Sequence, residues 1–223
     1  MSITQKIAEK LSKELKYDSE KSEVVAYGIF AVIQVSASIA LVIIFGLIFG
    51  IVFQALTFSF AASILRQFSG GAHASKPSIC LVVGTVATVG LAYVAHILAP
   101  VLNFGEFIAI AFVSFFYSYY FIYKKAPVDS AAKPIRSQSR KIKMKKISLC
   151  VLTAYLLFII IFTVLFLISQ NEVYLEYSLC FCFAIVWQAF NLTVIGHKVL
   201  GKIDSLIKKL FTLGKGGTIN EKN

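Results

Sequence analysis

Long stretches without charge constrain this chain more than any other feature of its sequence. No Asp, Glu, Lys or Arg occurs in five segments, which are Val24–Leu65, Pro77–Gly105, Phe107–Tyr123, Ile147–Asn171 and Tyr177–His197. A helix needs about 20 mostly apolar residues to cross the hydrocarbon core of a bilayer. The first segment is long enough for two such helices, and Gly46 and Gly50 mark the expected turn between them. The pattern therefore predicts an all-α polytopic membrane protein with six transmembrane helices.

The composition agrees, because only 15% of the residues are charged, whereas a soluble domain has about 25%. We expect a single membrane domain over residues 1–223, with a transmembrane region at 24–197 and a cytoplasmic tail at 198–223. The expected spans lie near residues 24–45, 47–65, 78–99, 105–123, 147–168 and 175–196.

The first 23 residues differ from the spans because they are charged. Ile3, Ile7, Leu11 and Leu15 recur every four residues, and the lysines fall elsewhere. This spacing predicts an amphipathic helix that lies in the membrane interface over residues 1–23. An ordinary solvated helix is the alternative interpretation.

Basic residues are confined to four segments outside the predicted spans. Five lysines lie in residues 1–23, Arg66 and Lys76 lie in the loop 66–77, nine Lys and Arg lie in the loop 124–146, and six lysines follow from Lys198 onward. The remaining connections carry only Glu106, Glu172 and Glu176, or no charge at all. Lys and Arg mark cytoplasmic loops. Both termini and both basic loops are therefore predicted to face the cytoplasm, as an even number of spans requires.

Several polar side chains lie inside the predicted spans. Gln34, Gln54, Gln188 and Asn191 are interpreted first as residues that tie helices together. The four cysteines lie in or next to apolar segments, where a disulfide is not expected. The net charge of +11 does not imply a nucleic-acid partner, because the basic residues are distributed over the cytoplasmic loops.

The loop between the second and third spans reads RQFSGGAHASKPSIC, residues Arg66–Cys80. Gly70–Gly71 allows a turn that residues with a Cβ resist, and Pro77 suits the first position of the next helix. Cys80 then falls in the first turn of that helix, where the helix dipole favours the reactive thiolate. If the loop folds back, His73 reaches Cys80, and a thiol with an imidazole base forms an activated nucleophile.

Arg66 could hold a substrate carboxylate or an oxyanion, and backbone N–H groups at the helix start could also bind an oxyanion. We expect no metal ion and no cofactor in this site. The same residues also fit a small transporter or peptide-export subunit, or a partner-binding membrane subunit, in which His73 and Cys80 have no chemical role. Apart from Glu106 and Glu176 at their outer ends, the spans carry only His and Cys, and no Asp, Glu, Lys or Arg, to mark an ion path, which weighs against a transporter.

The pattern R-x-x-x-G-G-x-H-A-x-x-x-x-x-C resembles the accessory gene regulator B family, which consists of membrane cysteine endopeptidases of bacterial quorum sensing. It is formed by Arg66, Gly70, Gly71, His73, Ala74 and Cys80. A second match, APVDSAAKPI at residues 126–135, is similar to the segment that this family carries after its fourth span. The resemblance covers nearly the whole chain and implies a location in the bacterial cell membrane.

The resemblance also implies a substrate and a reaction. The substrate would be a short propeptide on the inner membrane face, with an amphipathic N-terminal helix, a signal segment that contains a Cys, and an acidic C-terminal tail. Cys80 would cleave between signal and tail and retain the signal segment as a thioester, with His73 as base and then acid. The propeptide's own Cys would then attack this thioester and close a thiolactone ring.

The acidic tail of such a propeptide would be complementary to the loop 124–146, which has a net charge of +8. The charge of this loop also follows from membrane orientation alone, and the sequence leaves open whether Asp129, Lys133 and Pro134 contact substrate. A homodimer is compatible with the sequence.

Overall fold

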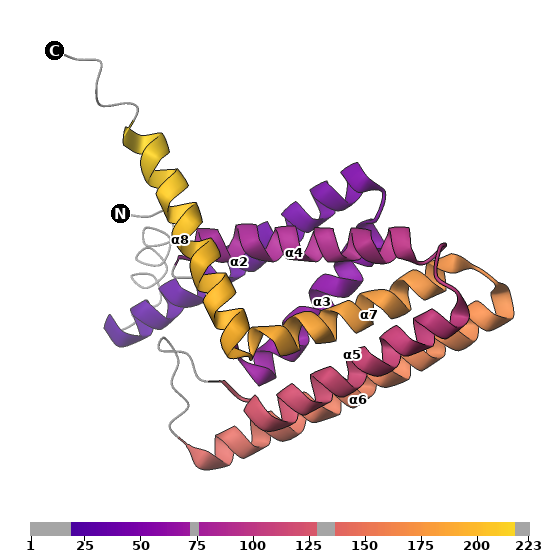
Figure 1. The fold of residues 1–223 in the computed structure, drawn as a ribbon. Coiled ribbons are helices and arrows are strands. Elements are labelled where there is room, and N and C mark those ends of the chain that lie inside the picture. Colours follow the sequence, from indigo (N-terminus) through magenta and orange to yellow (C-terminus); the bar gives the residue numbers. More distant parts are fainter. Residues whose placement is uncertain (1–18, 72–75, 129–136, 217–223) are drawn as a thin grey trace.

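The computed structural model describes residues 19–71, 76–128 and 137–216, which form seven helices and one isolated β-bridge. The helices are α2 (Ser19–Phe49), α3 (Val52–Ser69), α4 (Pro77–Leu98), α5 (Phe104–Lys125), α6 (Gln138–Ser169), α7 (Glu172–Asn191) and α8 (Val194–Gly216). Figure 1 shows α2 to α7 running back and forth as a bundle, while α8 turns away from it at one end. The all-α prediction is confirmed for the described residues. Most of the predicted interfacial helix, residues 1–18, lies outside them.

Gly50 forms the turn between α2 and α3, as the sequence predicts. Its φ is +70°, Gly50 N donates to Leu47 O at 3.3 Å, and Ile51 N donates to Gly46 O at 2.8 Å. This pair of hydrogen bonds is the Schellman arrangement, in which glycine ends a helix without steric cost. Gly46 remains inside α2, where an added Cβ would come within 2.9 Å of the Val52 Cα. It therefore allows the close approach of the two helices rather than the turn itself.

The number of spans differs from the prediction at α3. Five described helices are long and apolar enough to cross a membrane, and these are α2, α4, α5, α6 and α7. At 1.5 Å per residue, the 18 residues of α3 extend over about 27 Å, close to the roughly 30 Å of hydrocarbon. α3 differs from these five helices in its polar residues, such as Gln54 and Arg66, rather than in its length. The prediction of six spans is therefore not confirmed.

The helix α7 is the centre of the bundle. Buried residues make up 61% of its span, against 11–33% in the other four candidate spans, and it contacts α3, α4, α5 and α6. Phe58 and Leu65 of α3 and Leu179 and Ile185 of α7 are fully buried. The surrounding helices expose many large apolar side chains, which suits a surface in contact with lipid.

The last predicted span ends earlier than the sequence suggests. α7 stops at Asn191, and α8 begins at Val194 and continues through much of the segment expected as a tail. Thr193 Oγ1 accepts a hydrogen bond from Gly196 N at 2.9 Å. A Cβ at Gly196 would overlap the Phe190 carbonyl oxygen. Glycine therefore permits the sharp change of direction between the two helices.

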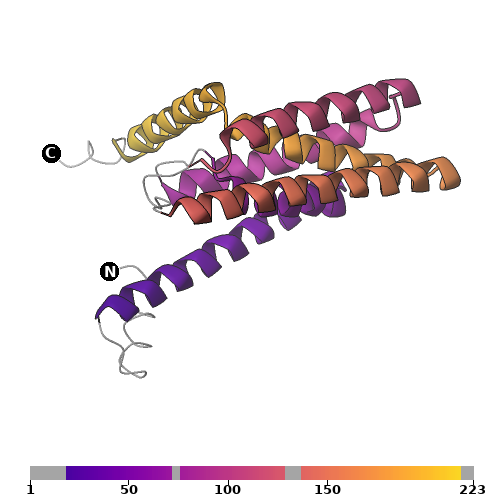
Figure 2. The same ribbon diagram turned by 90° about the horizontal axis from the view of Figure 1, so that it is seen from below.

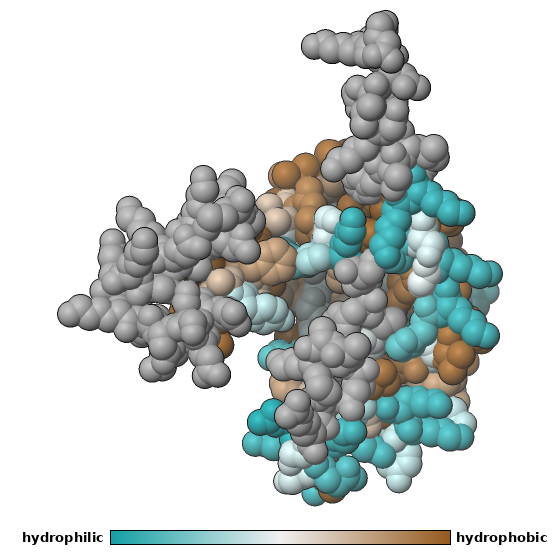
Figure 3. Space-filling model, turned by 90° about the vertical axis from the view of Figure 1, so that its left-hand side faces the viewer, coloured by the Kyte–Doolittle hydropathy of each residue, from teal (hydrophilic) through white to brown (hydrophobic). Residues whose placement is uncertain are grey.

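Basic residues gather at one end of the bundle, which we call the basic end. The α3–α4 and α5–α6 connections and the start of α8 lie there, and Figure 3, which looks onto this end, shows hydrophilic side chains gathered on it. Lys145 of α6 lies over the Tyr123 ring of α5, 4.3 Å from its centroid. The opposite end carries the α4–α5 and α6–α7 turns with Glu106 and Glu172. The charges are thus segregated as the sequence predicts, and the side of the membrane that each end faces stays a prediction.

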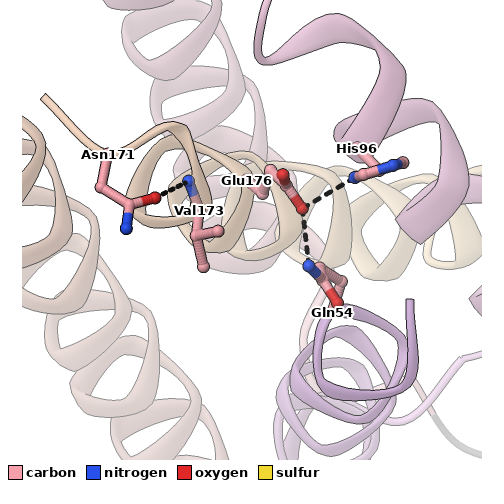
Figure 4. A network of polar contacts seen from close by, with 5 residues as sticks. All are labelled: Gln54, His96, Asn171, Val173 and Glu176. Atoms are coloured by element: carbon pink, nitrogen blue, oxygen red, sulfur yellow. Dashed lines mark hydrogen bonds and ion pairs between the residues drawn. The ribbon is translucent and has the colours of Figure 1, made fainter. Parts of the chain in front are cut away.

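Glu176 does not lie in a connection, as the sequence suggests, but inside α7, where it is only 5% exposed. Its Oε2 accepts a hydrogen bond from Gln54 Nε2 at 2.6 Å and lies 3.0 Å from His96 Nδ1. Figure 4 shows this contact between α3, α4 and α7, next to the start of α7, where Asn171 accepts from Val173 N. Because α7 begins one turn earlier, at Glu172, the carboxylate falls within the bundle. The prediction that Gln54 ties helices together is confirmed.

Replacing Gln54 by Leu should destabilise the bundle by about 1–3 kcal/mol, because the buried Glu176 carboxylate loses a hydrogen-bond donor. Thermal unfolding of the purified protein in detergent measures this loss. Thr57→Val is the matched control on α3, since the Thr57 hydroxyl bonds only within its own helix, to Phe53 O. An equal loss of stability in both variants would contradict the assignment.

Candidate functional site

Cys80 lies in the first turn of α4, as the sequence predicts. Pro77 occupies the first helical position, and Cys80 N donates to Lys76 O at 3.1 Å. Lys76 is the N-cap residue and makes no side-chain capping hydrogen bond. The Cys80 side chain is half-buried and forms no disulfide. A thiol at this place is close to the N–H groups that begin a helix, where negative charge is favoured.

A cavity of about 300 Å³ adjoins Cys80. It is lined by residues of α2, α3, α4 and α7, and Arg66, Cys80 and Gln188 are among them. Arg66 and Cys80 meet through this shared cavity, which both residues line. Figure 2 shows that α2 diverges from the other helices toward its N-terminus. The structure thus brings Arg66 and Cys80 together at the basic end of the bundle.

Gly70 and Gly71 form the turn that follows α3. Gly70 N donates to Arg66 O at 2.9 Å and ends the helix, and φ is +70° at Gly70 and +132° at Gly71. Residues with a side chain rarely adopt such angles. An added Cβ at Gly70 would also overlap the Val128 carbonyl oxygen. The predicted glycine turn is therefore confirmed, and Gly70 is required for close contact as well as for conformation.

The two sequence motifs that carry the resemblance meet at this turn. Val128 belongs to the segment 126–135, and its N–H donates to Ser69 O at 3.0 Å. Gly70 and Val128 form the isolated parallel β-bridge. The rest of that segment, with Asp129, Lys133 and Pro134, lies outside the described residues. The contact nevertheless explains why the two motifs occur together, since the chain after α5 packs on the chain after α3.

Gln188 connects the turn to the central helix. Its Nε2 donates to Ser69 Oγ at 2.8 Å and to Gly70 O at 2.7 Å, and the residue also lines the cavity next to Cys80. The sequence predicts Gln188 as a tie between helices, but not that its target is the glycine turn. The only signal was its position in an apolar span, which does not identify a partner.

Gln34 and Asn191, which the sequence also predicts to connect helices, differ in their hydrogen bonds. Gln34 Nε2 donates to Pro77 O at 3.3 Å and joins α2 to the start of α4. Asn191 is fully buried, and both polar atoms of its carboxamide have no hydrogen-bond partner among the residues that the structure describes. An added Cβ at Gly71 would lie 3.5 Å from the Asn191 Cβ. The prediction is thus confirmed for Gln34, and for Asn191 it stays a prediction.

His73, the predicted base, lies in residues 72–75, outside the described part of the chain, so its position relative to Cys80 stays a prediction. Cys180 and Cys182 are buried in α7 and unpaired, in agreement with their interpretation as small apolar residues.

Comparisons with known proteins place this arrangement in a family. The family model for Accessory gene regulator B matches residues 4–192. The chain is 39% identical to AgrB-like protein 2 of Clostridium perfringens strain 13, over 93% of this chain and 98% of that protein. It is 38% identical to an AgrB-like protein of Clostridium perfringens strain SM101, with the same coverage. No solved structure matches the chain. The chain is therefore a membrane protein that belongs to the accessory gene regulator B family, and this membership indicates a role in the quorum-sensing system of that name.

Proposed function

We propose that this protein is a membrane cysteine endopeptidase that processes an autoinducer propeptide. The main support is the position of Cys80, which lies in the first turn of α4 and shares a cavity with Arg66. The glycine turn that precedes His73 in the sequence is held next to the same cavity by Gln188. One end of the bundle thus carries a nucleophile, a cation and the glycine turn that leads to the predicted base.

In the first half of the reaction, the Cys80 thiolate attacks the carbonyl carbon at the junction of signal and tail. The carbon–sulfur bond forms, the carbon–nitrogen bond breaks, and His73 gives a proton to the leaving amine. Arg66 and the positive end of the α4 helix dipole stabilise the negative charge on the carbonyl oxygen. The acidic tail leaves, and the signal segment remains on Cys80 as a thioester.

In the second half, a thiol of the propeptide transfers its proton to His73 and attacks the thioester. The new carbon–sulfur bond closes the ring, and Cys80 leaves as a thiolate. One thioester replaces another, so this exchange is nearly neutral in free energy. A serine nucleophile would form an oxygen ester, from which a thiolactone is uphill. Water competes for the acyl group, and a site that is sheltered within the bundle favours ring closure.

The basic end suits a substrate with an acidic tail. Arg140, Lys141, Lys143, Lys145 and Lys146 begin α6 there, and complementary charge speeds association. We assign this end to the cytoplasmic face, where Lys and Arg concentrate. The same charges also set the orientation of the chain, so binding of the tail is a second role for them rather than the only one.

His73→Ala and Cys80→Ala should each abolish cleavage of a propeptide that is co-expressed with the protein, because nucleophile and base act as a unit. Gel mobility and mass spectrometry of the propeptide measure the loss. Cys150→Ala is the matched control, since Cys150 is an exposed cysteine on α6, away from the cavity. Cleavage that persists in Cys80→Ala, with normal membrane insertion, would contradict the peptidase assignment.

Gly70→Ala should strongly reduce cleavage and should destabilise the protein by more than about 1 kcal/mol, because a side chain meets both a positive φ and the Val128 carbonyl. Cleavage assays and thermal unfolding in detergent test the two effects. Gly28→Ala on α2 is the control, as no heavy atom lies within 4 Å of a Cβ added there. Wild-type cleavage in Gly70→Ala would show that the contact between the motifs is dispensable.

The orientation can be tested by labelling with a membrane-impermeant maleimide in a chain whose Cys80 and Cys150 are replaced by Ser. Val101→Cys, in the exposed α4–α5 turn, should react in intact cells. Ser139→Cys, at the start of α6, should react only after the cells are made permeable. The reverse result would place the active site outside the cell.

A further inference from the structure

The cavity beside Cys80 has a wall of unusual chemistry for the interior of a membrane bundle. Small or neutral polar residues recur at helical spacing on three of the four helices that line it, and these are Gln34, Ser38, Ser59, Ser63, Gly84 and Thr88. Arg66 is the one charged residue of its lining among the described residues. A bundle without a ligand would fill this space with apolar side chains, as the interior of a protein is normally close-packed.

We propose that this cavity receives the propeptide residue on the N-terminal side of the cleaved bond, here called the acyl residue, and that Gly84 sets the largest side chain it accepts. The inference rests on the proposed function and adds the recognition of the substrate to it. The acyl residue is the one whose carbonyl carbon becomes bonded to the Cys80 sulfur.

Bond geometry requires the acyl residue to lie next to Cys80. Its Cα is bonded to the same carbon as the sulfur, so its side chain begins within two bonds of the thioester. The thiol lines the cavity, which gives that side chain a place to enter. A cavity of about 150 Å³ already binds benzene, so the 300 Å³ found here can hold a large side chain together with part of its backbone.

The lining also predicts the kind of residue that binds. Hydroxyl and carboxamide groups such as those of Ser59, Ser63 and Gln188 can pair with the backbone amide of an extended peptide, which would otherwise lose its hydrogen bonds on leaving water. Arg66 repels a Lys or Arg side chain. The pocket therefore disfavours an acyl residue with a positive charge.

Gly84 is the position from which the size of the pocket can be changed. It follows Cys80 by one helical turn and lines the same cavity. No heavy atom lies within 4 Å of a Cβ built on it. A larger residue at position 84 can thus occupy the cavity without moving the backbone of α4.

Gly90 provides a matched control on the same helix. It also has no heavy atom within 4 Å of an added Cβ, but it lines a separate apolar hollow with Phe45, Phe49 and Tyr93. Substitutions at positions 84 and 90 therefore share the helix, the added side chain and the freedom from clashes. They differ in whether the side chain enters the cavity beside Cys80.

The experiment compares wild type, Gly84→Ala, Gly84→Leu and Gly90→Leu, each co-expressed with propeptides whose acyl residue is Ala, Leu or Phe. Mass spectrometry measures the processed fraction. Gly84→Leu should lower processing of the Phe propeptide relative to the Ala propeptide by about tenfold, since one methylene group more or less in a substrate pocket already changes specificity by about that factor. Gly84→Ala should show a smaller shift in the same direction, and Gly90→Leu should keep the wild-type ratio.

The pocket would be overturned if Gly84→Leu lowered the processed fraction of all three propeptides equally, or if Gly90→Leu shifted the ratio as Gly84→Leu does. In either case, Cys80-dependent cleavage by the wild-type protein would still uphold the proposed function. Absence of any Cys80-dependent cleavage would overturn both. Modification of Cys80 by methyl and benzyl methanethiosulfonate, in a Cys150→Ser background, gives a readout without substrate, because the thiolate forms a mixed disulfide with the reagent and methanesulfinate leaves. Gly84→Leu should slow the benzyl reagent more than the methyl reagent, and equal slowing would count against the pocket.

Discussion

A bilayer offers no hydrogen bonds to an exposed peptide group, so irregular backbone near the membrane must be paired by the protein itself. The end of α3 is the place where this chain meets that requirement with tertiary contacts. Arg66 O accepts from Gly70 N, Ser69 O accepts from Val128 N, and Gly70 O accepts from Gln188 Nε2. These carbonyl groups would otherwise be the unpaired ones of a helix C-terminus. The turn before the proposed site is therefore fixed by two other parts of the chain, one of which belongs to the most buried helix.

The same packing explains how polar side chains can gather inside a mostly apolar bundle. The central helix α7 supplies Gln188 and Trp187 to the cavity, while α3 and α4 contribute Arg66 and Cys80. α2 completes the lining through a stripe that includes Gln34 and Ser38. Polar groups therefore converge from helices that are far apart in sequence, and the apolar outer faces keep the assembly in the membrane. Glu176 shows the same principle at the opposite end, where Gln54 and His96 compensate a carboxylate that α7 draws into the interior.

Hydropathy and charge are sufficient to predict most helices of this chain. A helix in contact with lipid must be long and apolar, and basic residues concentrate at one end of the bundle. Gly50 and Pro77 could be located as well, since a Schellman turn and a first helical position have strong residue preferences. The contact between Gly70 and Val128 could not be predicted, because pairing between loops that are far apart along the chain leaves no local pattern in the sequence. Glu176 was misplaced because a charge normally marks a helix end. α8 was missed because its regular lysines resemble those of a solvated tail, and α3 shows that polar residues in a short helix obscure whether it spans.

The length of α6 has a further consequence. Its 32 residues make a rod of about 48 Å, well beyond the roughly 30 Å of a hydrocarbon core. The basic first turns of α6 carry part of the excess, and we expect them at the headgroup level, where Lys145 lies over the Tyr123 ring. Such an anchor determines how deeply the whole bundle is immersed, and with it the height of the Cys80 sulfur relative to the lipid phosphates. In a thicker or thinner bilayer, adjustment by tilt would carry the thiol up or down with the rod. Lipid composition thus changes the depth of the Cys80 thiol in the membrane through the tilt of α6.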